Sequence, residues 1–379
     1  MSDRRTKVLY LINSLALGGA ERQLCEVVRR LPTDRFEPVL VSLSNVNAYP
    51  ELLPPDQPRH VVTATGAAAL REVGAIVRAE RPDIVHSYME YANLMARLGS
   101  LLRPRPVVIT SVRSRMMALK YTAVEGVLSR LSDAVVVNSR GTARELRTIQ
   151  RVPADKVRVI MNILDADRFR PAGPEVRDRV RAELGLNGPT ILVPGRISLA
   201  KNQLGLCLAL GRLKAQGRLP AGATVLLAGR VYDRVVGGLM PRLARRYGIE
   251  EHLRDLGPVK DIVSLYAAAD WILLPSLWEG LPNAAIEAHA CARPLLLTAD
   301  ANIDGILEEG VTGHQFPTLS VAGMAAAMDR AFATPPDRAA AMGRAGRDRV
   351  LPMFHPDRVM GETVALYDAL LARRGGGVR

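Results

Sequence analysis

Short apolar runs rich in β-branched residues alternate with helical patterns along almost the whole chain. Strands that are apolar throughout and separated by helices are typical of parallel sheets covered by helices on both faces. The sequence therefore predicts an α/β fold. The expected strands are residues 8–12, 38–42, 60–63, 83–86, 107–110, 134–137 and 157–160, and then 190–194, 224–228, 271–275 and 294–298.

The pattern restarts after a polar segment rich in Pro and Gly, residues 169–189, which we interpret as a linker between two doubly wound, Rossmann-like domains. A length of 379 residues agrees with two domains of about 150 residues or more. We expect domains at 1–175 and 176–355, and a final helical segment at 356–379. Ligands bind beyond the carboxyl ends of parallel strands, so a site is expected in a cleft between the domains.

The formal net charge is +13, and residues 1–175 carry more than half of the excess. Such an excess favours an anionic partner: a membrane surface, a phosphorylated acceptor or nucleic acid. Residues 91–124 hold six basic and no acidic residues, with Met and Leu among the last of them. We interpret this stretch as a surface for anionic lipid or a lipid phosphate, with an ordinary solvated face as the alternative. The predicted acceptor or membrane patch consists of Arg103, Arg105, Arg113, Arg115 and Lys120.

Three cysteines, far apart and inside apolar helical patterns, predict buried thiols and a reducing compartment. Neither they nor the six histidines have a metal-ligand spacing. The apolar runs are much shorter than the roughly 20 residues that span a bilayer. We therefore expect a cytoplasmic protein, attached at most to the inner face of the membrane, that uses no metal or other cofactor.

Two features of the first half are candidates for ligand contact. Gly18 and Gly19 precede an expected helix at 20–31, where glycine lets backbone approach a ligand and a helix N-terminus attracts phosphate; a tight turn is the alternative. His86 ends the expected strand 83–86 and would face the cleft, although such a histidine can also be a hydrogen-bonded structural residue.

In the second half, Gly195 and Arg196 directly follow the strand 190–194, and Lys201 opens the next helix. Two cations at the carboxyl end of a parallel strand suit a diphosphate, because Arg binds through its fork and Lys as a point charge. A solvated face is the alternative.

The segment from Glu279 to Glu287 carries the strongest signal. Gly280 and Pro282 disfavour regular structure, so Glu279 is expected in the loop after the strand 271–275, and Glu287 a turn into a helix that begins near Asn283. The free amides at that helix end suit a phosphate or sugar hydroxyls, and a carboxylate suits the vicinal hydroxyls of a ribose.

The Glu279 to Glu287 spacing, with Glu-Gly-Leu-Pro-Asn-Ala at its start, resembles the signature of the retaining family 4 glycosyltransferases with the GT-B fold. The match runs from about residue 7 to residue 371. Met161 and Ala292 stand where the family often has Pro and Gly, which leaves the subfamily open. The remaining motifs follow the family's order: Gly18 to Arg22, His86, Asn138-Ser139, Met161 to Ile163, Gly195-Arg196, Lys201-Asn202, Gly229 and Asp270.

The resemblance implies two Rossmann-like domains and a last helix that returns to the first of them. It also implies that the sugar is transferred with retention of configuration and without a metal. It implies that Arg196 and Lys201 bind the diphosphate of a nucleotide sugar and that Glu287 holds the ribose hydroxyls. Backbone near Val259 would pack against the base. The implied catalytic residues are His86, Glu279, Arg196 and Lys201, and the implied donor-binding residues are Gly19, Arg196, Lys201, Val259, Glu279, Gly280, Leu281, Pro282, Asn283 and Glu287.

We expect a hexosyltransferase that uses a nucleotide-diphosphate sugar and acts on a hydroxyl of a lipid-linked saccharide in surface polysaccharide synthesis; a small soluble acceptor is the alternative. A nucleotide-sugar epimerase, an inactive membrane-associated partner subunit and a nucleic-acid-binding protein are competing interpretations. The glutamate segment resembles epimerases poorly, and the intact Arg196, Lys201, Glu279 and Glu287 argue against an inactive subunit. No nucleic-acid recognition motif accompanies the charge, so no nucleic-acid partner is expected.

Overall fold

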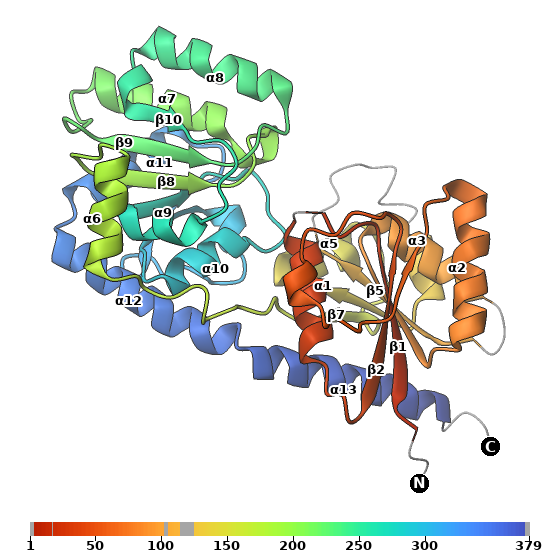
Figure 1. Cartoon of the computed structure of the whole chain (residues 1–379). Helices are drawn as coiled ribbons and strands as arrows, with labels where there is room; N and C mark the ends of the chain where they lie inside the picture. Colours follow the sequence, from red (N-terminus) through yellow and green to blue (C-terminus); the bar gives the residue numbers. More distant parts are fainter. Residues whose placement is uncertain (1–3, 17, 102–104, 114–124, 376–379) are drawn as a thin grey trace. The chain divides into compact units, whose positions relative to one another are not determined.

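The computed structural model describes residues 4–16, 18–101, 105–113 and 125–375. The chain folds into two compact units (Figure 1). One consists of Met1–Ile163 together with Pro356–Arg379, and the other of Leu164–His355. No helix within the described ranges is long and apolar enough to cross a membrane. All three cysteines are buried and unpaired, as the sequence predicts.

The sheet of the first unit is parallel throughout, with the order β3-β2-β1-β4-β5-β6-β7. Side chains of β1 alternate between its two faces: Val8, Tyr10 and Ile12 pack with α1 and α13, while Leu9 and Leu11 pack with α2 and α3. The strands are β1 (Thr6–Ile12), β2 (Phe36–Ser42), β3 (Arg59–Val61), β4 (Ile84–Tyr88), β5 (Val107–Val112), β6 (Ala134–Val137) and β7 (Val157–Val159). The helices are α1 (Gly19–Arg30), α2 (Gly66–Glu80), α3 (Glu90–Gly99), α5 (Arg140–Thr148) and α13 (Pro356–Gly375).

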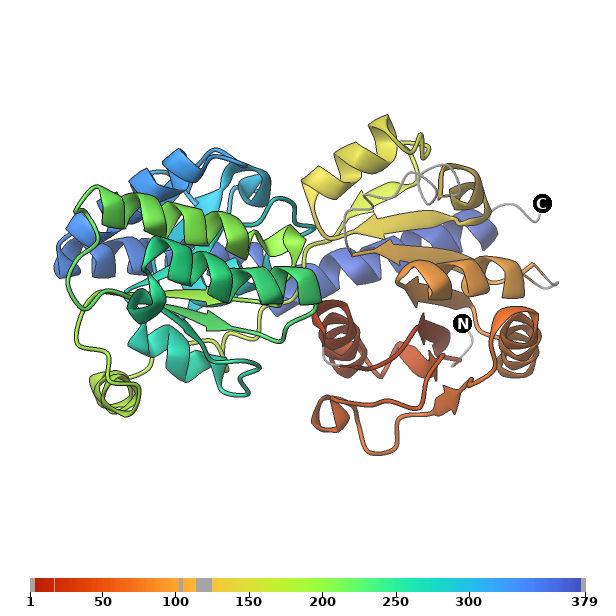
Figure 2. The same ribbon diagram turned by 90° about the horizontal axis from the view of Figure 1, so that it is seen from above.

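The second unit repeats this plan with the order β10-β9-β8-β11-β12-β13. Helices α7, α8 and α11 cover one face, and α7 and α8 lie side by side on it (Figure 2). The strands are β8 (Thr190–Pro194), β9 (Thr224–Ala228), β10 (Leu253–Asp255), β11 (Trp271–Leu274), β12 (Leu295–Thr298) and β13 (Gly313–Phe316). The helices are α6 (Pro174–Glu183), α7 (Gln203–Ala215), α8 (Arg234–Tyr247), α9 (Ile262–Ala268), α10 (Asn283–Ala290), α11 (Val321–Ala333) and α12 (Pro336–Met353).

These sheets confirm the predicted α/β fold, and every expected strand is present. The two edge strands of the second sheet, β10 and β13, were not predicted. Their sequences, Leu-Arg-Asp and Gly-His-Gln-Phe, contain few apolar residues because an edge strand is paired on one side only.

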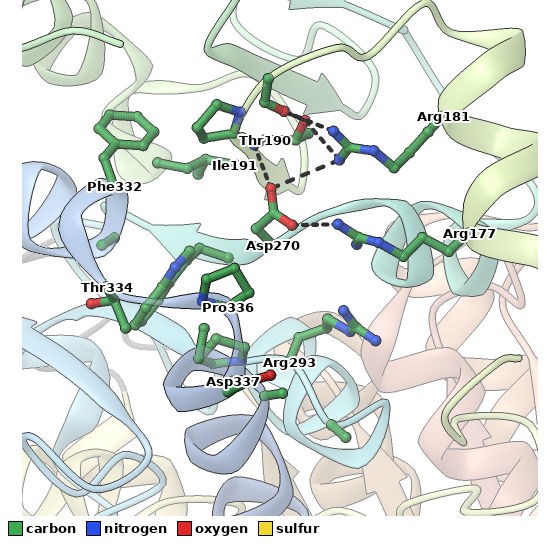
Figure 3. Close-up of a pocket in the computed structure, with 18 of the residues that line it drawn as sticks. Arg177, Arg181, Thr190, Ile191, Asp270, Arg293, Phe332, Thr334, Pro336 and Asp337 are labelled. Carbon is green, nitrogen blue, oxygen red and sulfur yellow. Dashed lines mark hydrogen bonds and ion pairs between the residues drawn. The ribbon is translucent and has the colours of Figure 1, made fainter. Parts of the chain in front are cut away.

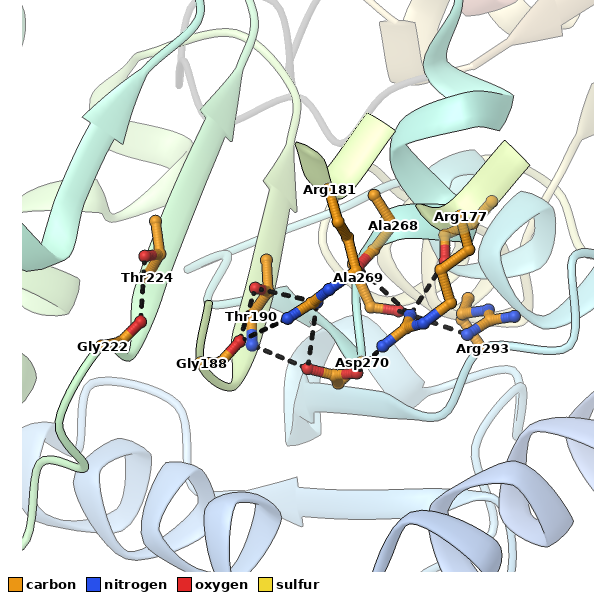
Figure 4. A network of polar contacts seen from close by, with 11 residues as sticks. Arg177, Arg181, Gly188, Thr190, Gly222, Thr224, Ala268, Ala269, Asp270 and Arg293 are labelled. Carbon is orange, nitrogen blue, oxygen red and sulfur yellow. Dashed lines mark hydrogen bonds and ion pairs between the residues drawn. The ribbon is translucent and has the colours of Figure 1, made fainter. Parts of the chain in front are cut away.

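The segment predicted as a linker, residues 169–189, contains helix α6. This helix is polar because only a narrow face of it is buried, and it packs against α9: Val180 is its buried residue, while Arg177 and Arg181 donate to carbonyl groups at the end of α9 (Figure 4). The amide of Leu164 donates to the Phe354 carbonyl at 2.9 Å. The division between the units therefore falls after residue 163, whereas the sequence analysis placed it after 175.

The last helix, α13, packs on the sheet of the first unit, as the resemblance implies. The Tyr367 hydroxyl lies 2.7 Å from Nδ1 of His86 and 3.0 Å from the Tyr10 hydroxyl. Nε2 of His86 lies 2.9 Å from the Ser111 hydroxyl. Both ring nitrogens of this histidine, which is 2% exposed, thus bond to the protein, and the bond from Nδ1 helps to hold α13 in place.

A buried ion pair joins α3 to the segment after residue 124. Arg97 is 1% exposed, and its Nη1 and Nη2 lie 2.8 Å and 2.5 Å from the carboxylate oxygens of Glu125. Its remaining donors reach Ser132 and Thr110 at 2.9 Å and 3.0 Å. Arg97 is therefore a structural cation in the interior and not part of a basic surface.

Replacing Arg97 with Ala should lower the free energy of unfolding of the first unit by about 3–5 kcal/mol, because Glu125 is left as an unpaired buried charge. Urea unfolding followed by circular dichroism measures this loss. Tryptophan fluorescence serves as an internal reference, since Trp271 and Trp278 both lie in the second unit. The control is Arg105→Ala, whose side chain is 36% exposed and for which about 0–1 kcal/mol is expected. A loss for Arg97→Ala as small as the control's would contradict the assignment.

Acid should destabilise the first unit through His86. Burial, and then the charge of Arg113, lower the pKa of His86 well below 6.5. The unfolded chain therefore binds a proton that the folded chain does not, and stability falls as the pH drops below about 6.5, by at most about 1.4 kcal/mol per pH unit. In His86→Gln this dependence should weaken in urea unfolding followed by circular dichroism.

The second unit supplies the reference for this experiment. Burial lowers the pKa of His289 to about 4, so the stability of the second unit should also fall in acid. Unfolding detected by tryptophan fluorescence measures this stability. That dependence should be the same in His86→Gln. An unchanged pH dependence of the first unit in His86→Gln would show that another group titrates there.

Candidate functional site

The carboxyl ends of β10, β9, β8 and β11 lie along one edge of the second sheet, because neighbouring strands pair in parallel. Four loops follow these ends: 195–202 after β8, 229–233 after β9, 256–261 after β10 and 275–282 after β11. All the predicted donor residues of the second half lie in these loops or in α10. The edge is therefore the candidate site.

Hydrogen bonds continue from β8 and β9 into the loops that follow them. The amides of Gly195 and Ile197 donate to the carbonyls of Ala228 and Arg230, each at 2.9 Å. A Cβ on Gly229 would lie 2.1 Å from the Gly195 carbonyl oxygen, so this close approach requires glycine. Gly195 itself has φ 127°, a backbone conformation that favours glycine.

Arg196 lies between Gly195 and Ile197, and its side chain is exposed. Its guanidinium carbon lies 4.7 Å from the ring centre of Tyr232, a cation–π contact that orients the side chain. The Arg196 carbonyl accepts a hydrogen bond from Gln203 at 3.0 Å, which ties the loop to α7. The guanidinium is thus oriented by Tyr232 and accessible to a ligand, while the backbone is fixed by Gln203.

Lys201 and Glu279 form an ion pair that joins the loops after β8 and β11. The Ser276 hydroxyl donates to Oε1 of Glu279 at 2.7 Å, and the amide of Leu277 donates to the Ala200 carbonyl at 2.8 Å. The two charged side chains are only 20% and 13% exposed, so water screens their interaction weakly. Both residues were predicted as site residues, but the contact between them was not predicted.

The positions of both glutamates agree with the sequence analysis. Glu279 lies in the loop after β11, and Glu287 lies one turn into α10, which begins at Asn283 after Leu281 and Pro282. The Tyr266 hydroxyl donates to Glu287 at 3.4 Å. Burial, followed by the charge of Glu287, raises the pKa of Tyr266 well above 10, so the phenol stays protonated and able to donate. No sequence pattern pointed to Tyr266, a buried residue of α9.

Val259 lies half-buried in the loop between β10 and α9, at the same edge of the sheet. Gly257, two residues earlier, has φ 64°, which turns the chain after β10. Within the described ranges, no group of three His, Cys, Asp or Glu side chains could hold a metal ion.

In the first unit, Gly19 begins α1, the first helix after β1. The Tyr49 hydroxyl accepts from the Gly18 amide and donates to the Gly18 carbonyl, both at 2.9 Å, which fixes the turn. His86, predicted as a catalytic residue at a strand end, lies instead in the middle of β4, because that strand continues to Tyr88. This corrects the predicted end of the strand; both ring nitrogens of the buried histidine are hydrogen-bonded, and its catalytic role stays a prediction.

Two residues of the predicted basic patch, Arg105 and Arg113, lie within the described ranges, and the patch itself stays a prediction. Arg105 precedes β5 and Arg113 follows it, so the two residues lie at opposite ends of one strand. Arg105 is 3.9 Å from Asp133, whereas Arg113 bonds Asn162 at 3.1 Å and stacks on Tyr88 at 4.7 Å. Arg103, Arg115 and Lys120 lie outside the described residues.

Comparison with known proteins gives matches over both units. The family model described as Glycosyltransferase Family 4 matches residues 17–168, and that described as Glycosyl transferases group 1 matches residues 188–334. The alpha-maltose-1-phosphate synthase of Mycolicibacterium smegmatis is 27% identical over 78% of this chain and 81% of its own length. The D-inositol 3-phosphate glycosyltransferase of Segniliparus rotundus is 29% identical over 91% of this chain and 77% of its own length.

Solved structures share the fold. A glycosyltransferase from Rickettsia africae superposes with a TM-score of 0.84 at 20% identity, covering 97% of this chain and 99% of its own. Anabaena HepE, solved in complex with UDP-glucose, gives 0.83 at 20% identity, covering 95% and 100%. With both family models matching and the GT-B fold present, the chain belongs to the family 4 glycosyltransferases.

Proposed function

We propose that this glycosyltransferase takes its sugar from a nucleotide-diphosphate sugar bound at the carboxyl edge of the second sheet. The observation that carries the proposal is the grouping of Arg196, the Lys201–Glu279 ion pair and the start of α10 at that edge. Two cations and a helix N-terminus suit a diphosphate. Anabaena HepE, solved with UDP and with UDP-glucose, supports this donor class.

Each part of the donor has a candidate contact. Arg196 and Lys201 bind the diphosphate, and Glu287, held by Tyr266, accepts from the ribose hydroxyls. Glu279 and the backbone of residues 280–283 bind the sugar, and Val259 packs against the base. Gly19, at the start of α1 in the first unit, is a further proposed contact to the donor.

Charge develops on the diphosphate as the bond to the sugar breaks. Arg196, Lys201 and the N-terminal dipole of α10 stabilise that charge in the transition state, so these groups accelerate transfer without a divalent cation. We propose that the acceptor hydroxyl attacks the same face of the sugar from which the diphosphate leaves, which retains the configuration. The departing phosphate accepts the hydroxyl proton, and no pair of glycosidase-like carboxylates is required.

A small phosphorylated acceptor is the first candidate. The relatives named above are an alpha-maltose-1-phosphate synthase and a D-inositol 3-phosphate glycosyltransferase, which supports this class. A lipid-linked saccharide, used in polysaccharide synthesis at the inner membrane face of the cytoplasm, is the second candidate, favoured by the net charge of +13. Binding to vesicles of anionic lipid, lost in high salt, would support the second candidate.

Lys201→Ala should weaken nucleoside diphosphate binding by about 10- to 100-fold, because a hydrogen bond to a charged group contributes about 1.5–3 kcal/mol. Isothermal titration with UDP, GDP, TDP and ADP identifies the base and measures the loss. The control is Lys214→Ala, at the other end of α7 and 39% exposed, which should bind like the unmodified chain. No binding of any of the four by the folded chain would contradict the proposed donor.

Glu279→Gln should separate binding from transfer. The substitution removes the carboxylate that pairs with Lys201, so a nucleoside diphosphate should bind at least as tightly as before. Sugar transfer, measured as UDP or GDP release with acceptor, should fall 10-fold or more, because the contact to the sugar is lost. Equal losses of diphosphate affinity in Glu279→Gln and Lys201→Ala would indicate that the ion pair only supports the loops.

A further inference from the structure

A cavity of about 860 Å³ opens at the amino edge of the second sheet, the edge opposite the candidate donor site (Figure 3). Thr190 and Trp271, which begin β8 and β11, line it together with Pro294, which precedes β12. Helices α6, α11 and α12 contribute the other walls. Much of the lining is apolar, including Pro189, Ile191, Trp271, Phe332, Pro336 and Ala340.

The charged lining residues are four arginines and two aspartates, which gives a formal net charge of +2. Asp270 already has partners on both carboxylate oxygens: Arg177 at 2.5 Å on one, and the Thr190 amide at 2.8 Å on the other (Figure 4). Arg181 lies 3.7 Å from the second oxygen. Both carboxylate oxygens of Asp270 are therefore already used in contacts to α6 and to Thr190. The other lining charges are Arg293, Arg344 and Asp337.

Arg293 is the least compensated of these cations. It donates to the Ala269 carbonyl at 3.2 Å, but its Nε is buried and has no partner among the residues that the structure describes. Burial, and then the neighbouring charge of Arg177, lower the pKa of Arg293. Its surroundings thus disfavour its charge, and an anion in the cavity would offset both the burial and the repulsion.

Arg344 directly follows the residue of α12 that packs against the turn holding Arg293. A Cβ on Gly343 would lie 2.0 Å from the Ala292 carbonyl oxygen and 3.2 Å from the Arg293 nitrogen, so α12 lies directly against this turn. Arg344 is exposed and has no ion pair within the described part of the chain. Two guanidinium groups on adjoining backbone segments suit one oxyanion with several acceptors.

We propose that this cavity binds a small phosphate monoester with an apolar or aromatic body, its phosphate held by Arg293 and Arg344. A dianionic phosphate balances the net charge of the lining. The volume lies in the range of small-molecule sites, and the apolar walls have room for much more than a free phosphate ion. The site is distinct from the donor site and does not depend on the proposed reaction.

The test is isothermal titration of the full chain with phenyl phosphate and, separately, with inorganic phosphate. Phenyl phosphate should bind at least 10-fold more tightly than inorganic phosphate, because its ring buries apolar surface against the walls. Arg344→Gln and Arg293→Gln should each weaken phenyl phosphate binding 10-fold or more. Arg344 is exposed, so its variant remains informative if Arg293→Gln does not fold.

Two further variants separate the cavity from other sites. Ala340→Trp should abolish phenyl phosphate binding by filling the cavity with no change of charge, whereas Arg338→Gln, an exposed arginine of α12 outside the lining, should leave it unchanged. Lys201→Ala should also leave it unchanged, and titration of the same proteins with UDP tests the donor site independently. Binding lost only in Lys201→Ala, binding unaffected by Arg344→Gln and Ala340→Trp, or no binding of phenyl phosphate would each overturn the proposal.

Discussion

Parallel pairing of β8 with both β9 and β11 is the constraint on which the candidate site depends. The pairing brings three loops to one edge, and hydrogen bonds from Gly195 and Ile197 extend it beyond the strand ends. Only then can Lys201 reach Glu279 from a different loop. The absence of a side chain at Gly229 is as necessary as the charges, since a Cβ there would push the first two loops apart.

The central strands could be predicted from the sequence because they are buried on both faces and are therefore apolar throughout. The same reasoning missed β10 and β13, and it could not fix the end of β4, which placed His86 wrongly. Gly280 and Pro282 located Glu279 and Glu287 because these two residues restrict the backbone locally. The Lys201–Glu279 and Tyr266–Glu287 contacts join residues from separate elements, and no local pattern encodes them.

The arginines of this basic chain differ in how their charge is compensated. Arg97 is fully buried but fully paired, and its partner Glu125 lies one residue beyond the end of the basic stretch that includes it. Arg177 uses its guanidinium to satisfy carbonyl groups at the end of α9. Arg196 is exposed and supported by an aromatic ring. Composition alone cannot separate these roles, because each depends on contacts between residues that are apart in the sequence.

The edge strands have a consequence for the behaviour of the chain at high concentration. An unpaired strand edge is a template for aggregation, and the risk grows with its length and apolar character. All four edge strands of the two sheets, β3, β7, β10 and β13, are only three or four residues long. The long apolar strands lie inside the sheets with both sides paired. The sequences most prone to intermolecular association are thus the ones that the fold shields from a second copy.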